Sequence, residues 1–362
     1  MPGWREADFG PALAAFRRQC ARLEARTPDA ALSGEARYGG TVGQWLPACA
    51  RAELVAAGGE RAFFESHFVA HFVESSGGQA RLTGYYEPVV NVSWVRAPGY
   101  TEPLLERPFD AVTVDLGAFA EAYDSEALRG APRRLTGKLY GDRVGPYPSR
   151  AEINAAPPSP AFAWAHPVDV YTLQVQGSGR IRFPDGSERR AAYAFQNGYR
   201  WRSAIGRARE LGRISDGSWA GFRRYLDSLD ETSARAALAE DPSYVFFANE
   251  AIADPSIGPK GAANVHLTPM GSMAVDPAFH PYGALLFFDA QYDGAPMRRL
   301  VVAQDTGGAI RRGPLRGDLF FGTGPEAGAR AERMNAEGVR FWTLIPRAAQ
   351  TPVALADPAT LS

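Results

Sequence analysis

The chain has 362 residues, of which 45% are hydrophobic and 22% are charged, so it can bury a large core and form two domains. Its 39 lysines and arginines balance 40 aspartates and glutamates. Without an excess of either sign, the composition excludes a general electrostatic attraction to nucleic acid or to an anionic membrane surface. We therefore expect a globular protein that recognises its partners through local sites.

The N-terminal part of the chain is predicted to be helical. Apolar residues recur at helical spacing over 9–24, directly after Asp8, a residue type that caps helix N-termini. A second helix is predicted over 59–74, where phenylalanines recur every four residues. The phenylalanine stripe is typical of a buried core.

The two cysteines, Cys20 and Cys49, leave two readings open. They are either small buried apolar residues or one disulfide formed in an oxidising compartment. The opening residues MPGWREAD lack the charged and then apolar pattern of a secretory signal. The residues alone thus allow a cytosolic protein or a secreted one whose signal has been removed.

From position 81 the sequence changes to short β-rich runs separated by Gly and Pro, which predicts a meandering antiparallel sheet. A turn is predicted at Pro184, Asp185 and Gly186. The predicted strands are RLTGYYEPVVNVSWV (81–95), VDVYTLQVQGSGRIRF (168–183) and RRAAYAF (189–195).

The C-terminal half begins with a predicted helical section over 201–240 and then returns to strands. Strands are predicted at 285–291 and 298–305, followed by a helix near 326–337 and a last strand at 339–345. This order is mainly β with helices at the flanks, unlike the regular alternation of a doubly wound α/β sheet.

Several common site types are excluded by their spacing. His67 and His71 lie four residues apart, but the run lacks the glutamate of a zinc protease, so no metal site is expected. The glycine-rich run 322–328 misses the dinucleotide spacing by one residue, and Glu326 would repel a phosphate. Because no Gly-x-Ser-x-Gly motif occurs either, we expect no nucleotide cofactor and no serine nucleophile.

Two carboxylates, Asp305 and Asp318, stand at the edges of predicted strands and are joined by a glycine-rich loop. Loops on a rigid β scaffold often carry catalytic groups. The same spacing also suits two aspartates that cap turns. Spacing alone does not decide between these roles.

Six segments, taken in order, resemble the membrane-bound lytic murein transglycosylase A family, and the last two resemble its three-aspartate (3D) domain. These segments are LTGYYEPV (82–89), LQVQGSGRI (173–181), FQNGYRWRSAIGR (195–207), DPSYVFF (241–247), LTPMGSMAVDPAFHPYGALLFF (267–288) and VVAQDTGGAIRRGPLRGDLFFGTGPEAG (301–328).

The resemblance implies a fold and a set of domains. The main domain would be a six-stranded double-psi β-barrel with flanking helices, formed by residues 1–95 and 196–362. A smaller β domain would be inserted at 96–195, with a groove between the two. The implied secretion favours the disulfide between Cys20 and Cys49.

The resemblance also implies the site residues. The family's catalytic carboxylate matches Asp318, and Asp305 would support it, either as a like charge that raises the pKa of Asp318 or by holding the loop at Gly307 and Gly308. Aromatic and amide groups would bind the glycan. The candidate substrate-binding residues are Thr83, Tyr85, Tyr86, Gln174, Gln176, Gly177, Asp276 and Gly307.

The implied activity is cleavage of the β-1,4 bond between N-acetylmuramic acid and N-acetylglucosamine in peptidoglycan. One aspartate is sufficient as acid and then base, because the attacking 6-hydroxyl belongs to the muramic sugar itself and is therefore tethered. The expected protein is a periplasmic monomer without cofactor, anchored to the outer membrane in the native form, with glycan strands and other cell-wall enzymes as partners. The alternatives are a peptidoglycan-binding protein without activity and an inverting β-1,4-glycan hydrolase.

Overall fold

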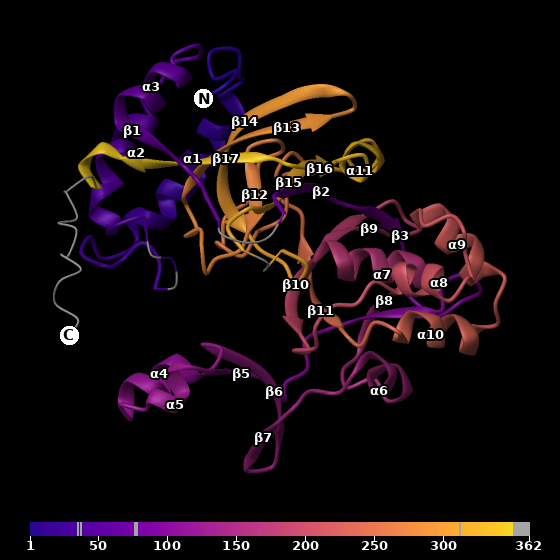
Figure 1. Cartoon of the computed structure of the whole chain (residues 1–362). Helices are drawn as coiled ribbons and strands as arrows, with labels where there is room; N and C mark the ends of the chain where they lie inside the picture. The colour runs from indigo at the N-terminus through magenta and orange to yellow at the C-terminus, as the bar shows by residue number, and fades with distance from the viewer. Residues whose placement is uncertain (35, 37, 76–78, 311–312, 350–362) are drawn as a thin grey trace. The chain divides into compact units, whose positions relative to one another are not determined.

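The computed structural model describes residues 1–34, 36, 38–75, 79–310 and 313–349, and the chain divides into two compact units (Figure 1). Unit 1 contains residues 1–86 and the chain from 256 onwards, and unit 2 contains residues 87–255. The predicted inserted domain, 96–195, lies wholly within unit 2, which begins earlier and ends later. Each unit combines β-sheet with helices, so the described chain is a mixed structure with more helix than the mainly β prediction implies.

Unit 1 is built on eight strands in one sheet. Strand β12 lies in the row between β14, to which it is parallel, and β15, to which it is antiparallel. The strands in spatial order are β1 (Phe68–Phe72), β17 (Arg340–Pro346), β13 (Leu285–Tyr292), β14 (Ala295–Asp305), β12 (Ser272–Val275), β15 (Arg316–Thr323), β2 (Arg81–Glu87) and β16 (Asn335–Glu337).

The sheet of unit 1 is buried on both faces at its centre. In β13, Leu285 and Phe287 pack into one apolar core with the N-terminal helices, whereas Leu286 and Phe288 pack into a second core on the other face. This explains why the strand is apolar at successive positions rather than alternating. The helical segments of unit 1 are α1 (Gly10–Glu24), η1 (Val42–Gln44), α2 (Leu46–Ala52), α3 (Glu60–His67), α11 (Pro325–Glu332) and η2 (Arg347–Ala349).

The first predicted helix is confirmed by α1, and the Asp8 carboxylate accepts a hydrogen bond from the Gly10 amide at 3.1 Å. The second prediction, a helix over 59–74, is wrong in its C-terminal half. Helix α3 ends at His67, and the next five residues form β1, paired with β17. Phe64 and Phe68 are buried in the core, but Phe72, the next phenylalanine of the stripe, is exposed. Pairing with a strand distant in sequence determines the conformation here.

The helix predicted near 326–337 is also too long. Helix α11 ends at Glu332, and β16 then pairs with β2 through Asn335 and Thr83. The last strand, predicted at 339–345, is confirmed by β17. As at β1, a long-range strand pairing replaces the end of a locally favoured helix.

Unit 2 contains three small sheets and seven helices. Its strands are β3 (Val89–Asn91), β4 (Glu102–Leu105), β5 (Ala111–Asp115), β6 (Arg134–Tyr140), β7 (Arg143–Gly145), β8 (Ala161–Ala165), β9 (Gly179–Arg182), β10 (Glu188–Gln196) and β11 (Val245–Ala251). Its helices are α4 (Leu116–Ala122), α5 (Glu126–Arg129), α6 (Arg150–Ala155), α7 (Pro167–Gln176), α8 (Ala204–Glu210), α9 (Trp219–Asp227) and α10 (Glu231–Ala239).

The predicted strand 168–183 is wrong in its first part, which forms helix α7. The helix starts at Pro167, a favourable first position, and the ring of His166 accepts a hydrogen bond from the Val168 amide at 3.2 Å. One side of α7 packs against the cluster of helices α8, α9 and α10, and another packs against the four-stranded sheet. A helix that is apolar on two sides cannot be told from a buried strand by periodicity.

A disulfide links Cys20 on α1 to Cys49 on α2, with the two Cα atoms 5.3 Å apart. The cysteines lie in the apolar core that α1 and α2 share with Trp45 and Phe16. The bond closes a loop between residues 29 apart in sequence. It therefore restricts the unfolded chain as well as joining two helices.

Replacing both cysteines by serine should lower the free energy of unfolding by about 3 kcal/mol, because the unfolded chain regains the entropy of the opened loop. Urea unfolding of the oxidised protein and the double variant measures this difference. Reduced wild-type protein is the matched control and should resemble the variant. Two reactive thiols in the unfolded, unreduced protein would contradict the disulfide.

Candidate active site

Asp305 and Asp318 lie in one row across the sheet of unit 1. Ala274 on β12 pairs with Asp305 on one side and with Asp318 on the other. Directly paired residues point to the same face of a sheet, so the two carboxylates share a face with only a methyl group between them. Their backbones are separated by two strand spacings, about 9–10 Å.

A β-bulge places Asp305 on this face. The register between β12 and β14 passes from Met273 with Ala303 to Ala274 with Asp305, so Gln304 is an extra residue. Gln304 is fully buried; it donates to the carbonyl of Ala15 on α1 at 2.9 Å and accepts from Ser272 at 2.6 Å. Without the bulge, Gln304 would occupy the position of Asp305, and the carboxylate would point to the other face.

The Asp305 carboxylate accepts three hydrogen bonds. Oδ2 accepts from the Tyr85 hydroxyl at 3.0 Å, and Oδ1 accepts from the backbone amides of Ala262 and Thr306, each at 2.9 Å. Burial raises the pKa of Asp305, and these three donors oppose the rise. The carboxylate thus ties the turn at 261–262 and the loop that follows β14 to the sheet.

The Asp318 carboxyl has a simpler environment. Its Oδ1 accepts a hydrogen bond from the Thr83 hydroxyl at 2.6 Å, and Thr83 Oγ1 in turn accepts from Arg316 Nη2 at 2.6 Å. Within the described residues, Thr83 is the sole hydrogen-bond partner of Asp318's side chain. Burial raises the pKa of Asp318 to about 6, with a further contribution from the Asp305 charge, while Arg316 and Thr83 lower it.

An apolar cluster in unit 1 accounts for the desolvation. The ring of Tyr85 lies 5.3 Å from that of Phe320, the second residue after Asp318 in β15. Phe320 thus provides an apolar flank beside Asp318. The buried members of the cluster are Tyr85, Leu267, Ala274, Ile310 and Phe320.

Comparison with known proteins finds two family domains and several relatives. Residues 81–248 match the MltA specific insert domain, and residues 271–345 match the 3D domain. The membrane-bound lytic murein transglycosylase A of Escherichia coli strain K12 is 32% identical over 281 residues, which are 74% of this chain and 66% of that relative. This chain thus spans 66% of the length of that curated relative.

Solved structures extend the comparison to the fold. A membrane-bound lytic murein transglycosylase from Agrobacterium tumefaciens superposes with a TM-score of 0.79 at 29% identity, covering 96% of each chain. Escherichia coli MltA with bound chitohexaose gives 0.64 at 27% identity, covering 92% of this chain and 89% of that chain. The chain belongs to the membrane-bound lytic murein transglycosylase A family.

Asp276, predicted above to bind substrate, has a different environment from Asp305 and Asp318. It follows β12 and is buried, and its two carboxylate oxygens accept from the backbone amides of Ala278 and Gly313. These bonds hold together the segment that follows β12 and the residues that precede β15. We therefore expect Asp276 to shape the site rather than to contact glycan.

The predicted aromatic pair in β2 divides between the two faces of the strand. Tyr85 points to Asp305, whereas the Tyr86 ring packs against Gly328 of α11, where an added Cβ would lie 2.8 Å from the ring. Gly307 lies in the loop after Asp305 and accepts a hydrogen bond from the Ile310 amide at 3.0 Å. Thr83, Tyr85 and Gly307 thus belong to the surroundings of the two carboxylates.

The predicted pair Gln174 and Gln176 does not share a strand face, because both residues lie on α7. Gln174 is buried; its Oε1 accepts from Arg150 Nη1 at 2.5 Å and its Nε2 donates to the Val245 carbonyl at 3.2 Å. Both ends of its amide are therefore bonded inside unit 2, which leaves none for a glycan. Gly177, at φ 83°, ends the helix in the left-handed conformation.

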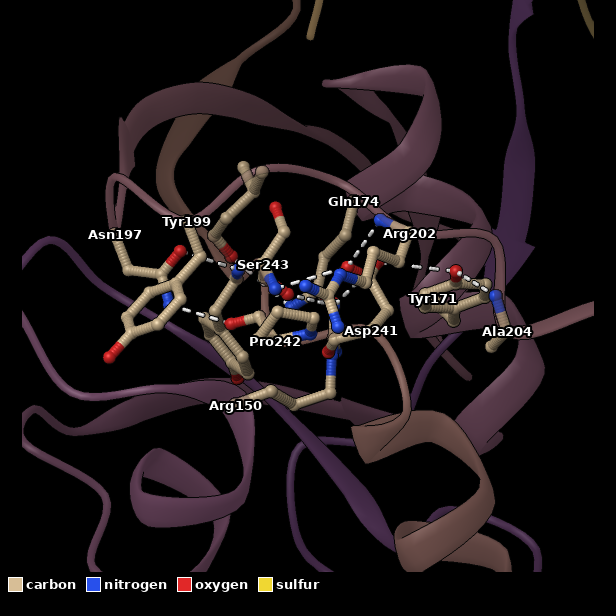
Figure 2. Close-up of polar contacts among 12 residues, drawn as sticks. Arg150, Tyr171, Gln174, Asn197, Tyr199, Arg202, Ala204, Asp241, Pro242 and Ser243 are labelled. Atoms are coloured by element: carbon tan, nitrogen blue, oxygen red, sulfur yellow. Dashed lines mark hydrogen bonds and ion pairs between the residues drawn. The ribbon is translucent and has the colours of Figure 1, made fainter. Parts of the chain in front are cut away.

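Figure 2 shows the buried network of unit 2 to which Gln174 belongs. The Arg150 guanidinium donates to the backbone carbonyls of Asp241 and Ser243 as well as to Gln174. Its charge also lies over the Tyr171 ring, 5.1 Å from the centroid. These contacts join α6, α7 and the start of β11, so we assign the network a structural role.

Glu87, another carboxylate in the segment 82–89, is fully buried in two ion pairs. Its oxygens accept from Arg190 Nε at 2.6 Å and from Arg180 Nε at 3.1 Å. Arg180 also donates to the Pro255 carbonyl, so it joins the first and last residues of unit 2. Both oxygens of Glu87 are thus held by guanidinium groups inside unit 2, so we assign it a structural role.

Sequence reasoning missed Arg316 and the turn at Ala262. Arg316 precedes Asp318 by two residues on one strand, and this period-2 spacing places both on one face, a signal that the sequence contains. The contact between Ala262 and Asp305 has no such signal, because it joins residues 43 apart. Gly261 permits it, since an added Cβ would lie 2.5 Å from the Gln304 carbonyl.

Among the described residues, no group of three or more histidine, cysteine, aspartate or glutamate side chains is arranged to hold a metal ion. Within the same residues, every helix is too short or too polar to traverse a lipid bilayer.

Replacing Asp318 by Asn should stabilise the protein at neutral pH. A carboxyl whose pKa is raised from 3.8 to about 6 makes the folded state weaker as pH rises through that window, because ionisation in the buried site is unfavourable. Asn avoids this loss, so the variant should gain about 2 kcal/mol above that window and nothing below it.

Urea unfolding at a series of pH values measures this difference. Asp29→Asn, the same change at an exposed position, is the matched control and should show no gain. An Asp318→Asn protein whose stability parallels the wild type at every pH would contradict the raised pKa.

Proposed function

We propose that this protein is a peptidoglycan lytic transglycosylase that cleaves the β-1,4 bond between N-acetylmuramic acid and N-acetylglucosamine. The observation that carries the proposal is Asp318: a carboxyl in an apolar site, with a pKa of about 6 and one oxygen without a hydrogen bond from the described residues. Family membership supports the reaction type, and the chitohexaose bound to the Escherichia coli relative supports a glycan substrate.

In the first step, protonated Asp318 donates its proton to the glycosidic oxygen as the bond from that oxygen to the muramic anomeric carbon breaks. The leaving N-acetylglucosamine keeps the proton as its 4-hydroxyl. The positive charge that develops on the muramic ring is then opposed by the new Asp318 carboxylate.

In the second step, the Asp318 carboxylate removes the proton of the 6-hydroxyl on the same muramic sugar, and the 6-oxygen bonds to the anomeric carbon. The product is a 1,6-anhydro end, and the acid is regenerated. No water is consumed. Because the nucleophile is tethered, its effective molarity can reach about 10⁵ M or more, which removes the need for a separate base to activate it.

Asp305 is proposed to support this reaction without exchanging protons. Its charge raises the pKa of Asp318, and its three hydrogen bonds hold the surrounding backbone. Tyr85 and Gly307 remain proposed substrate contacts beside the carboxylates, whereas the Thr83 hydroxyl is proposed to act on Asp318 rather than on the glycan. The double-psi topology of unit 1, the groove between the domains, the monomeric state and the cell-wall enzyme partners stay predictions.

We also propose a periplasmic location, with an outer-membrane anchor in the native protein. The membrane-bound curated relatives support the anchor. The disulfide between Cys20 and Cys49 supports an oxidising compartment, because disulfides rarely persist in the cytosol.

The product distinguishes this activity from hydrolysis. Digestion of purified sacculi in heavy-oxygen water should release muropeptides with 1,6-anhydro ends, without label and without an equal rise in reducing sugar, because the 6-hydroxyl captures the anomeric carbon. Mass spectrometry measures both. Labelled reducing ends as the main product would establish an inverting or retaining hydrolase instead.

Asp318→Asn should reduce the release of anhydro ends by several orders of magnitude, because the shape remains while the transferable proton is lost. Binding of chitohexaose, measured by calorimetry, should change little. Asp305→Asn is the matched control. It should lower both the rate and the melting temperature, because Asn has only one side-chain oxygen and cannot accept all three hydrogen bonds that the two oxygens of Asp305 accept. An Asp318→Asn protein with a tenth of wild-type activity would remove Asp318 from the mechanism.

A further inference from the structure

Thr83 stands between a guanidinium and the acid, and this position restricts where protons can lie. Arg316 Nη2 has no lone pair to accept with, so the 2.6 Å contact is a hydrogen bond from Arg316 to Thr83 Oγ1. Thr83 carries one hydroxyl hydrogen, and its second contact is to Asp318 Oδ1, also at 2.6 Å. That hydrogen therefore points to Asp318.

A proton on Oδ1 would disrupt this arrangement. Thr83 would have to accept from both Arg316 and Asp318, and its own hydrogen would turn away from the carboxyl. The contact between Thr83 and Asp318 would then persist with its direction reversed, but the Thr83 hydrogen would lose its acceptor in a partly buried site, at a cost of about 1 kcal/mol or more. A proton on Oδ2 leaves both hydrogen bonds intact.

We propose that Thr83 and Arg316 form a positioning pair that keeps the transferable proton of Asp318 on Oδ2, the oxygen that has no hydrogen-bond partner among the described residues. This inference rests on the proposed role of Asp318 as the acid. Neither residue exchanges a proton with the glycan. Their part is to present the acid proton to one side and to hold the carboxylate that remains.

The same pair acts on the charge that appears during the reaction. After proton transfer, the Asp318 carboxylate keeps the Thr83 hydrogen bond and the nearby Arg316 charge, both of which favour the ionised form. Burial and the Asp305 charge favour the neutral form. The Tyr85 hydroxyl, which lies close enough to feel both carboxylates, donates to Asp305.

Balance between these effects matters because one residue must give a proton and then take one. A carboxyl stabilised too strongly as the anion is a poor base, and one stabilised too strongly as the acid is a poor proton donor. Arg316 and Thr83 provide the stabilisation of the anion in the described part of the site.

Infrared spectroscopy tests the proton position without relying on activity. Near pH 5, which lies between the usual aspartate pKa of about 3.9 and the value for Asp318, the difference between wild type and Asp318→Asn isolates the carbonyl stretch of protonated Asp318. With the proton on Oδ2, Oδ1 is the carbonyl oxygen and accepts from Thr83. Thr83→Val should then shift this stretch to higher frequency, and Thr83→Ser should leave it near the wild-type position.

An unshifted stretch in Thr83→Val would overturn the proposal, because it would mean that the carbonyl oxygen does not accept from Thr83. This result is independent of the reaction. Failure of the proposed function would instead appear as wild-type protein that releases no anhydro ends from sacculi.

The pH dependence of turnover tests the same pair in the reaction. Activity requires the protonated acid, so it should fall as pH rises through about 6 in the wild type. Thr83→Val should lower kcat by about tenfold to a hundredfold with little change in KM, and should move the fall in activity to higher pH. Thr83→Ser, which keeps the hydroxyl, should have a kcat and a pH profile close to those of the wild type.

Two substitutions of Arg316, one that removes the positive charge and one that keeps it, test its role. Arg316→Met should move the fall in activity to higher pH, whereas Arg316→Lys should keep it closer to the wild-type position. A residue with only a structural role would change the melting temperature without moving the pH profile. Wild-type kcat and pH profile in both Thr83→Val and Arg316→Met would contradict the positioning pair.

Discussion

The site depends on two carboxylates, Asp305 and Asp318, that lie on one face of a sheet. The β-bulge at Gln304 turns Asp305 to that face. The Gln304 side chain bonds to α1 through the Ala15 carbonyl and to β12 through Ser272. The position of Asp305 is therefore linked to the packing of the N-terminal helix, which the Cys20–Cys49 disulfide joins to α2. A helical layer without catalytic residues thus contributes to the geometry of the acid site.

Opposing electrostatic effects then determine what Asp318 can do. Burial over the Phe320 cluster and the charge of Asp305 favour the neutral acid, while Arg316 and Thr83 favour the anion. Without the first pair of effects, the carboxyl would lose its proton near the ordinary aspartate pKa of about 3.9, so a far smaller fraction of molecules would carry the acid proton near neutral pH. Without the second, it would hold its proton too firmly. A pKa of about 6 is the result of both.

Local sequence patterns correctly predicted elements such as α1 and β13, whose conformation is favoured by nearby residues. The segment 301–328 indicated Asp305 and Asp318. The failures have physical causes. Residues 68–72 continue a helical spacing but pair with β17, and α7 is apolar on two sides. The predicted strand 168–183 included Gln174, which lies on α7 instead. The bulge at Gln304 and the amide of Ala262 depend on contacts between distant segments, which single-sequence patterns do not contain.

A hydrolase would need a second carboxylate that is open to water, and the contacts of the three candidate carboxylates differ in this respect. Asp305 accepts three hydrogen bonds, and both of its oxygens are therefore already used to hold Tyr85 and the neighbouring backbone. Glu87 is paired with two guanidinium groups. Asp318 differs from both, because its described contacts occupy one oxygen and leave the other for the substrate. A site with one such carboxyl suits a reaction whose nucleophile belongs to the substrate, since a tethered hydroxyl needs a proton acceptor only after the acid has become a carboxylate.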